Sequence, residues 1–291
     1  NIKTKDFQWT SNFNIAFNRN KVKELAEGVT AKTSIASFDN NYNTMPSYVA
    51  KVGYPIGMMY GYLYEGTYKL DDFSAVGSDY VLKTGVPYFS ADGKDGIKPG
   101  YPKYKDINGD GVVDDNDRTI IGRGEALHTG GFTNNFTYKG FDLSIFLQWS
   151  YGNDILNANR LIFESTFNKR QNLNQFASYA NRWSMENQDS NIPCVNTSAG
   201  NRVFSSRVIE DGSFLRIKDV VFGYSFPKNL LKKMSIDKLR VFVSAQNLVT
   251  FTSYSGYDPE VSVRNSALTP GLDYSAYPRT VNFNFGINVG F

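Results

Sequence analysis

The chain has 291 residues, of which 41% are hydrophobic and 20% charged, and its 31 Lys plus Arg against 28 Asp plus Glu give a net charge of +3. This composition excludes a disordered or collagen-like chain, and the even spread of charge, without a basic run, argues against a nucleic-acid partner. No run approaches the ~18 consecutive apolar residues that a membrane helix needs.

Several segments alternate between apolar and polar residues along the chain. In the last twelve residues every second position from Val281 to Phe291 is apolar, which is the period of a β-strand. Strands of ten residues or more suit a bilayer, because globular strands average about five or six residues and membrane strands need ~9–11. The sequence therefore predicts an all-β fold, an antiparallel transmembrane β-barrel section. Its seven strands are expected at 7–19, 54–67, 129–138, 141–151, 213–226, 237–250 and 279–291.

Two of these strands carry unusual residues. The stretch 54–68 is rich in tyrosine, which is typical of the aromatic girdle at a membrane surface. In 213–226, Arg216 and Lys218 share a face with Val220, and we expect this basic end to project beyond the bilayer into water. Helix signals are weak, the best being 175–185.

The connections alternate between short and long. Lys139-Gly140 predicts a tight hairpin and 227–237 a short link, whereas 68–128, 152–212 and 251–278 exceed ordinary loop lengths. Outer-membrane barrels have short periplasmic turns and long extracellular loops. With Phe291 at the periplasmic end, each long loop is expected on the extracellular side. The strand at 7–19 is then expected to descend, that is, to run from the extracellular to the periplasmic side. Only the segment 20–52 fits poorly, because it is too long for a periplasmic turn.

The segment 106–117 places oxygen ligands at positions 1, 3, 5, 7, 9 and 12 of a calcium loop of the EF-hand type, with Gly111 at position 6. Position 12 departs from that pattern, because an aspartate replaces the bidentate glutamate, as in dockerin loops. The alternative is a loop of asparagine and aspartate turns without metal. A structural Ca²⁺ would be held by Asp106, Asn108, Asp110, the carbonyl of Val112, Asp114 and Asp117.

Catalytic chemistry is not indicated. His128 is the only histidine, which argues against a Ser-His-Asp triad or a histidine-ligated zinc. Cys194 is a lone thiol in a loop, with no neighbouring base in the sequence to activate it. Acidic pairs such as Asp71/Asp72 and Glu210/Asp211 are typical of solvated loops. We expect no catalytic residue and no enzyme activity.

Five short sequence segments indicate a particular protein family more specifically than the alternation of apolar and polar residues does. They resemble the SusC/RagA family of TonB-linked, or TonB-dependent, outer-membrane transporters, and they are spread over nearly the whole chain in the family's order. The strings are 52–61 (VGYPIGMMYG), 104–122 (YKDINGDGVVDDNDRTIIG), 131–148 (GFTNNFTYKGFDLSIFLQ), 215–224 (LRIKDVVFGY) and 239–248 (LRVFVSAQNL).

This resemblance implies a 22-stranded barrel closed by an N-terminal plug, in the outer membrane of a Gram-negative bacterium. It implies uptake of oligosaccharides or peptides with a SusD-like lipoprotein, driven through TonB, which pulls on the plug. Residues 1–291 would be the C-terminal section of that barrel, in contact with outer-membrane lipids and with the remainder of the barrel. The plug would be absent from this chain, and the odd strand count is consistent with a section.

Two alternatives remain open at this point. One is a self-contained small barrel with a structural or adhesive role, which predicts an even strand count. The other is a soluble calcium-containing β-sandwich that binds glycans, which predicts that the alternating faces pack on each other. The loops 168–193 and 253–277 are expected to contact the substrate or the lipoprotein, but individual substrate-binding residues are not predicted.

Overall fold

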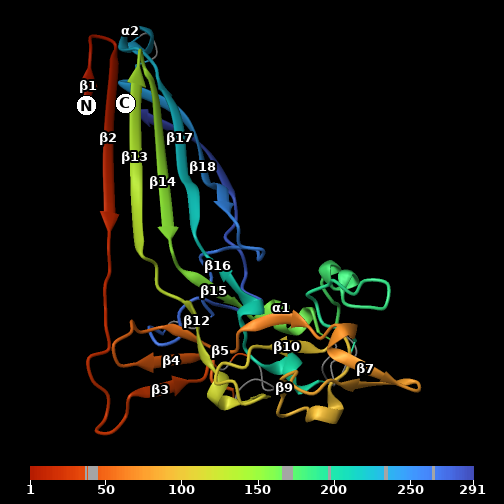
Figure 1. The fold of residues 1–291 in the computed structure, drawn as a ribbon. Coiled ribbons are helices and arrows are strands. Elements are labelled where there is room, and N and C mark those ends of the chain that lie inside the picture. Colours follow the sequence, from red (N-terminus) through yellow and green to blue (C-terminus); the bar gives the residue numbers. More distant parts are fainter. Residues whose placement is uncertain (37, 39–44, 166–172, 196–197, 233–234, 264–265) are drawn as a thin grey trace.

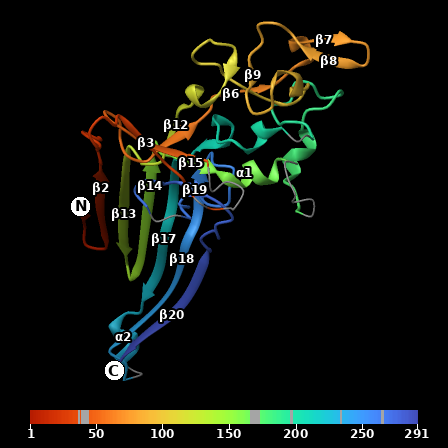
Figure 2. The ribbon, with the colours of Figure 1, turned by 90° about the horizontal axis from the view of Figure 1, so that it is seen from below.

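The computed structural model describes residues 1–36, 38, 45–165, 173–195, 198–232, 235–263 and 266–291. One tall sheet of long strands adjoins, at one end, a body of loops and short strands (Figures 1 and 2). We call this body the loop layer; it comprises the described residues of 17–127, 152–213 and 253–281. Among the described residues, no helix is both long and apolar enough to cross a membrane.

The tall sheet is entirely antiparallel, and six of its seven strands are 9 to 15 residues long. These lengths suit membrane-spanning strands. The prediction of an all-β, antiparallel fold is therefore confirmed. In spatial order the strands are β1 (Ile2–Lys3), β2 (Phe7–Ala16), β13 (His128–Tyr138), β14 (Phe141–Tyr151), β17 (Phe214–Ser225), β18 (Lys238–Thr252) and β20 (Asn282–Gly290).

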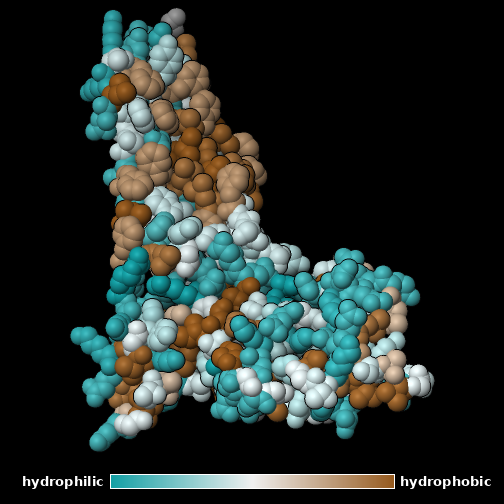
Figure 3. Space-filling model, viewed as in Figure 1, coloured by the Kyte–Doolittle hydropathy of each residue, from teal (hydrophilic) through white to brown (hydrophobic). Residues whose placement is uncertain are grey.

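The two faces of the sheet differ in polarity. Across β14 and β17, Ile145 pairs with Val220 on one face, whereas Ser144 pairs with Val221 on the other. The apolar face is open: the Phe285 side chain is 83% exposed, and hydrophobic residues gather over the sheet in Figure 3. A continuous exposed apolar surface of this kind is typical of a lipid-facing barrel wall.

The strand expected at 54–67 is not part of this sheet. The segment instead forms two short strands of the loop layer, β5 (Met58–Gly61) and β6 (Tyr64–Thr67). Tyr62 and Tyr68 are buried in the core of that layer, so the expected aromatic girdle is wrong here. Alternating tyrosines mark a half-buried strand in either setting, and tertiary packing decides which.

The strand direction at 7–19 also needs correction. β2 pairs directly with β13 in antiparallel register, so it ascends where descent was expected. Residues 17–127 then form one continuous excursion into the loop layer. The segment 20–52, which fitted poorly as a turn at the opposite end, belongs to this excursion, and its length is no longer anomalous.

A β-bulge in β17 changes which face its basic residues occupy. The register shifts between Ile217 and Asp219 against both neighbouring strands. Arg216 therefore pairs with Gln148 on the polar face, opposite to the face of Val220. The expectation that Arg216 shares the apolar face and leaves the bilayer is wrong, because one extra residue reverses the alternation.

The expected hairpin at Lys139-Gly140 is confirmed. Tyr138 pairs with Phe141, and the two turn residues have φ angles of 47° and 91°. Positive φ at both central positions is the geometry of a type I′ turn, which glycine adopts without strain. The other short link contains α2 (Lys228–Leu231).

The loop layer contains most of the buried core. Three hydrophobic clusters of the described residues lie there: one around Tyr48 and Met59, one around Tyr62 and Tyr104, and a small one of Ile155, Tyr254 and Val261. Its strands are β3 (Ala31–Ser34), β4 (Tyr48–Lys51), β5, β6, β7 (Phe73–Val76), β8 (Asp79–Leu82), β9 (Tyr88–Phe89), β10 (Pro102–Tyr104), β11 (Val112–Val113), β12 (Thr119–Arg123), β15 (Asp154–Asn157), β16 (Ile209–Asp211) and β19 (Leu272–Asp273).

The helices of the loop layer are short. α1 (Ala158–Phe163) is its α-helix within the described ranges, and where a helix was expected at 175–185 the chain forms a 3-10 helix, η4 (Ala177–Asn181). The other 3-10 helices are η1 (Leu70–Asp72), η2 (Lys94–Gly96), η3 (Asp115–Asp117), η5 (Ala199–Arg202) and η6 (Ser206–Val208).

Candidate binding cavity

A cavity of about 1000 Å³ lies in the loop layer, lined by α1 and by residues 174–178, 255–257 and 275–278. This volume is at the upper end of the range for ligand pockets, roughly 300–1,000 Å³. Parts of both loops expected to contact the substrate therefore meet here. Residues 168–172, which belong to the first of these loops, lie outside the described part of the chain.

The placement of α1 explains which side chains reach the cavity. The helix follows directly on β15, and its residues Ala158 and Leu161 are buried in the core beside Leu156. Residues three apart lie on one face of a helix, so this face is fixed by packing. The side chains of Arg160 and Glu164 then line the cavity.

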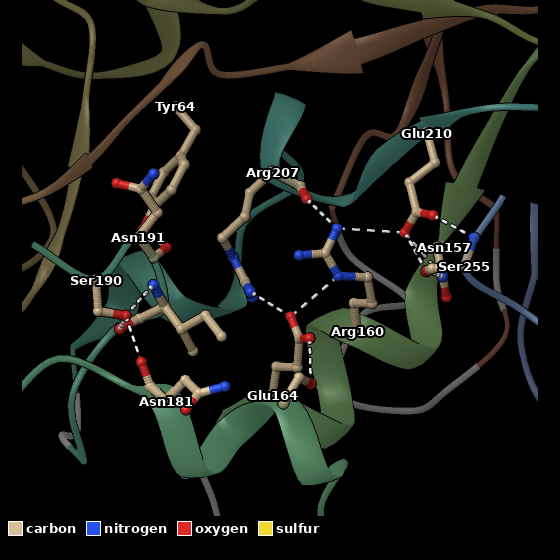
Figure 4. A network of polar contacts seen from close by, with 12 residues as sticks. Tyr64, Asn157, Arg160, Glu164, Asn181, Ser190, Asn191, Arg207, Glu210 and Ser255 are labelled. Carbon is tan, nitrogen blue, oxygen red and sulfur yellow. Dashed lines mark hydrogen bonds and ion pairs between the residues drawn. The ribbon is translucent and has the colours of Figure 1, made fainter. Parts of the chain in front are cut away.

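A network of ion pairs includes Arg160 and Glu164 of the cavity lining and extends to Arg207 and Glu210 beyond it (Figure 4). Glu164 accepts hydrogen bonds from Arg160 Nε at 3.0 Å, from Arg207 Nη1 at 3.1 Å and from the Ser178 hydroxyl at 2.7 Å. Arg160 Nη1 also donates to Glu210 at 3.2 Å and to the backbone oxygen of Arg207 at 3.0 Å. Two arginines thus meet two glutamates, and these four described side chains together carry no net charge.

Glu210 is held in its ionised form by this network. Burial raises its pKa, but hydrogen bonds donated by the backbone and hydroxyl of Ser255, the charge of Arg160 and a hydrogen bond from Asn157 outweigh burial. The pKa of Glu210 is therefore lowered below its usual range. The carboxylate stays charged at neutral pH and keeps Arg160 neutralised.

The same region continues into a second set of polar contacts (Figure 4). Tyr64 donates its hydroxyl hydrogen to the backbone oxygen of Asn191 at 2.7 Å, and Ser190 donates to the backbone oxygen of Asn181 at 2.6 Å. Burial raises the pKa of the Tyr64 phenol. The first contact ties β6 to the segment 181–191, and the second holds that segment to itself.

A separate cluster of charges fixes the last loop to the polar face of the sheet. Arg216 is only 2% exposed, and its Nη2 donates to Asp258 at 2.6 Å while its Nη1 donates to Glu260. Lys218 and Arg279 also pair with Glu260, at 3.8 Å and 3.1 Å. We call this cluster the loop anchor. Because the loop folds over the polar face, that face is the inner one.

The pKa of Asp258 is lowered in the loop anchor. Burial raises it, but hydrogen bonds donated by the backbone of Glu260, the side chain of Arg216 and the backbone of Arg279, with the charge of Arg216, outweigh burial. Asp258 is therefore ionised throughout the neutral range. A cavity of about 590 Å³ adjoins the anchor along the inner face and is lined in part by Trp149, Gly130 and Glu260.

The loop 106–117 is shaped by hydrogen bonds from its own amides. The two side-chain oxygens of Asp106 accept from Gly109 and Gly111, and those of Asp117, which is fully buried, accept from Ile107, Asn108 and Asp114. Asn108, Asp110 and Asp114 accept from Asp110, Val112 and Asn116, respectively.

These contacts within 106–117 define the form of the loop. Within the described part of the chain, no three or more His, Cys, Asp or Glu side chains are placed to hold one metal ion. Asn108 and the carbonyl of Val112, which belong to the expected ligand set, are not among those residue types, and calcium at 106–117 stays a prediction from the spacing of its oxygen donors.

The two reactive residue types considered from the sequence lie away from the cavity. His128 Nδ1 accepts a hydrogen bond from Trp149 Nε1 at 3.1 Å, and its ring stacks on Tyr151 with centroids 5.0 Å apart. The Cys194 thiol donates to the backbone oxygen of Pro99 at 3.7 Å. Both are accounted for by packing, and the cavity is equipped for binding through amides, hydroxyls and aromatic rings.

Sequence reasoning did not identify the cavity wall. Arg160 and Glu164 are four residues apart, which is a detectable helical pair. Their further partners, Arg207 and Glu210, are more than 40 residues away in sequence. No local pattern indicates that these four charges meet.

Known proteins are similar to this chain in sequence and in fold. No family model matches the chain. Over its full length it is 34% identical to TonB-dependent receptor P3 of Formosa agariphila and 26% identical to TonB-dependent receptor SusC of Bacteroides thetaiotaomicron, covering 27% and 25% of them. The solved RagAB peptide transporter matches with a TM-score of 0.72 at 21% identity, over 100% of this chain and 28% of that one. The chain thus spans about a quarter of the length of the curated relatives it matches.

Proposed function

We propose that the chain forms part of the wall and the extracellular loops of a TonB-dependent outer-membrane importer, because its whole length is similar to a section of SusC-type receptors. The resemblance stated from the sequence is confirmed, and these relatives are named as receptors and a transporter, not as enzymes. The observation that carries the proposal is the sheet of long strands with one open apolar face, continuous in the chain with the loop layer.

The outer membrane of a Gram-negative bacterium is the location that fits this wall. The apolar face would contact outer-membrane lipids, and the edges at β1 and β20 would pair with the remainder of the barrel. We propose a SusD-like lipoprotein as the partner at the loop layer, TonB acting through a plug outside this chain, and oligosaccharides or peptides as cargo. The similarity to the TonB-dependent receptor SusC and to the RagAB peptide transporter supports these assignments.

The proposal predicts the composition of the native complex. Extraction from outer membranes in mild detergent, followed by intact mass measurement, should give a polypeptide several times longer than 291 residues that contains this sequence, with a lipoprotein in the same complex. Disruption of TonB should abolish uptake of the cargo without changing the amount of the complex. A chain of only these residues, without a partner, would instead support the self-contained small barrel.

The β-sandwich alternative is disfavoured by the geometry of the sheet. A sandwich needs a second sheet over the alternating apolar face. Phe283, Phe285 and Ile287 are instead 60%, 83% and 68% exposed on that face. Packing against lipid accounts for these side chains, and packing against a second sheet of the described chain does not.

Calcium binding by 106–117 is a separate prediction with its own test. Hydrogen exchange of this segment should slow on adding about 1 mM Ca²⁺, the range of extracellular calcium modules. Asp110→Ala should remove the calcium response, because it deletes one donor of the expected ligand set. The two hydrogen bonds that Asp110 accepts, from Val112 and Asn108, are exposed to solvent, so their loss should disturb the loop without metal less than loss of the buried Asp117. Asp117→Ala should loosen the loop with or without the ion, by about 1–3 kcal/mol, since it leaves buried amides without acceptors.

The control for this test is Mg²⁺, which fits the long, flexible donor set poorly. Equal exchange rates in calcium and in chelator, for the natural chain and for Asp110→Ala alike, would show that the loop is held by its own hydrogen bonds.

A further inference from the structure

We propose that the 1000 Å³ cavity of the loop layer binds an uncharged, hydroxyl-rich ligand, a short neutral oligosaccharide, with Tyr257 and Tyr277 as stacking platforms. The inference rests on the proposed function and chooses between its two cargo classes. It is carried by the charge balance of the cavity, by its hydrogen-bonding groups and by its exposed rings.

The charge balance comes first. Arg160 and Glu164 are the two charged side chains among the described lining residues, and they pair with each other at 3.0 Å. The second arginine and the second glutamate behind the wall complete a neutral set. A free peptide carries a charged amine and a charged carboxylate, and each needs an opposite charge when it leaves water. Among its described lining residues, the cavity has no surplus charge of either sign to offer.

The remaining polar groups suit hydroxyls. The lining includes Asn159, Asn174, Gln175, Ser178 and Ser255. The Ser178 and Ser255 hydroxyls donate within the chain and retain acceptor lone pairs, whereas Asn159 Oδ1 accepts from the backbone of Ser275 and leaves its amide N–H groups as donors. Sugar hydroxyls likewise donate and accept. Asn157 is 2% exposed, and its Oδ1 has no hydrogen-bond partner among the described residues. A buried acceptor without a donor is costly, and it marks a position where a hydroxyl would be favoured.

Aromatic rings supply the apolar part of the site. Tyr257 and Tyr277 line the cavity and are 82% and 86% exposed, which is unusual for large rings. Within the described chain no hydrogen bond holds either phenol, so packing in this chain does not explain their presence. An open ring face is suited to the C–H face of a pyranose. Phe163 and Phe176, with centroids 5.4 Å apart, form a further apolar surface in the same cavity.

The test uses the whole complex purified from outer membranes. It is exposed to an array of neutral oligosaccharides and, in parallel, to a tryptic digest of casein. We expect retention of one or more neutral oligosaccharides. Tyr257→Ala and Tyr277→Ala should each lower the affinity for the retained oligosaccharide about tenfold, which is the effect expected for the loss of one aromatic contact. The corresponding Phe variants, which keep the ring, should change affinity by less than about threefold.

Tyr54→Ala is the matched control, because Tyr54 is an exposed tyrosine of the loop layer outside the cavity. It should leave affinity unchanged. The neutral-sugar assignment would be overturned if the complex retained peptides and this retention fell in the Tyr257 and Tyr277 variants. It would also be overturned if the double alanine variant bound oligosaccharides as well as the natural chain does. TonB-dependent uptake is measured on the same variants. Uptake of peptides would overturn this inference and leave the importer standing, whereas loss of any TonB dependence would overturn the importer itself.

Discussion

Replacing Arg216 with alanine is expected to release the last loop from the inner face of the sheet. Asp258 and Glu260 would lose the cation that lies between them, and Asp258 is itself buried. Removing one partner of a buried ion pair typically costs about 3–5 kcal/mol, because the other charge is left without compensation. Hydrogen exchange of the described parts of 253–281 should accelerate accordingly, with little change in β13 and β14.

Arg279→Ala provides the matched control for this prediction. Arg279 pairs with the same glutamate at 3.1 Å, but its side chain is 52% exposed. An exposed pair is worth about 0–1 kcal/mol, so the loop should stay anchored. Similar exchange in both variants would mean that Arg216 is not the principal contact of the loop anchor.

Acid should also loosen the loop anchor. A carboxylate with a lowered folded-state pKa stabilises the fold above the ordinary pKa of aspartate, about 3.9, and loses this effect as pH falls through the lowered value. For Asp258 the contribution is therefore complete at neutral pH and disappears only in strong acid. The protection factor of the loop, which is its exchange rate corrected for the intrinsic pH dependence of amide exchange, should be constant from about pH 5 to 8.

Replacing Glu164 with alanine is expected to open the wall of the cavity. Its carboxylate is the shared acceptor for Arg160, Arg207 and Ser178, and the side chains of Glu164 and Arg207 are only 5% and 7% exposed. Loss of the carboxylate leaves Arg207 buried without a full counter-charge, at a cost of about 3–5 kcal/mol. Exchange should accelerate in α1 and in 206–211, and binding of any cavity ligand should fall with it.

Glu164→Gln separates charge from shape in this prediction. The amide keeps the size of the side chain and one acceptor oxygen, so its effect should lie between those of the natural residue and of alanine. Glu186→Ala serves as the control, because Glu186 is exposed in the same loop and accepts a single hydrogen bond, from Ser184. Equal effects of the Glu164 and Glu186 changes would contradict the central role of the network.

The strands that the sequence predicts best are those whose alternation is continuous. In 280–291 the period of two has no exception, and β20 forms there as expected. The failure at 54–67 has a physical cause: tyrosine is amphipathic and serves equally at a membrane surface and in a half-buried core. The β17 bulge could not be predicted, because one unpaired residue leaves no signal in the sequence. Arg216 and Val220 are an even number of residues apart, so a regular strand would place them on the same face.

The cavity shows a different limit. The two loops that the sequence predicts to contact the cargo or the lipoprotein supply part of its lining, but the sequence predicts neither the contribution of α1 nor the individual residues. Arg160 meets Arg207 and Glu210 only because β15 and β16 pair in the folded chain. Tyr257 and Tyr277 are ordinary loop tyrosines in the sequence, and only their exposure beside a cavity distinguishes them. Contacts between distant segments are set by tertiary packing, which a local pattern does not encode.

The concentration of buried side chains in the loop layer has a consequence for divergence. Since Tyr48, Met59, Tyr62 and Tyr104 hold that layer together from within, its surface side chains carry few constraints from the membrane wall. The wall needs only alternation and register, conditions that many residue combinations satisfy. Two parts under such different rules are free to change at different speeds, so descendants of one ancestral chain can acquire new specificities at the loop surface while their lipid-facing strands remain interchangeable.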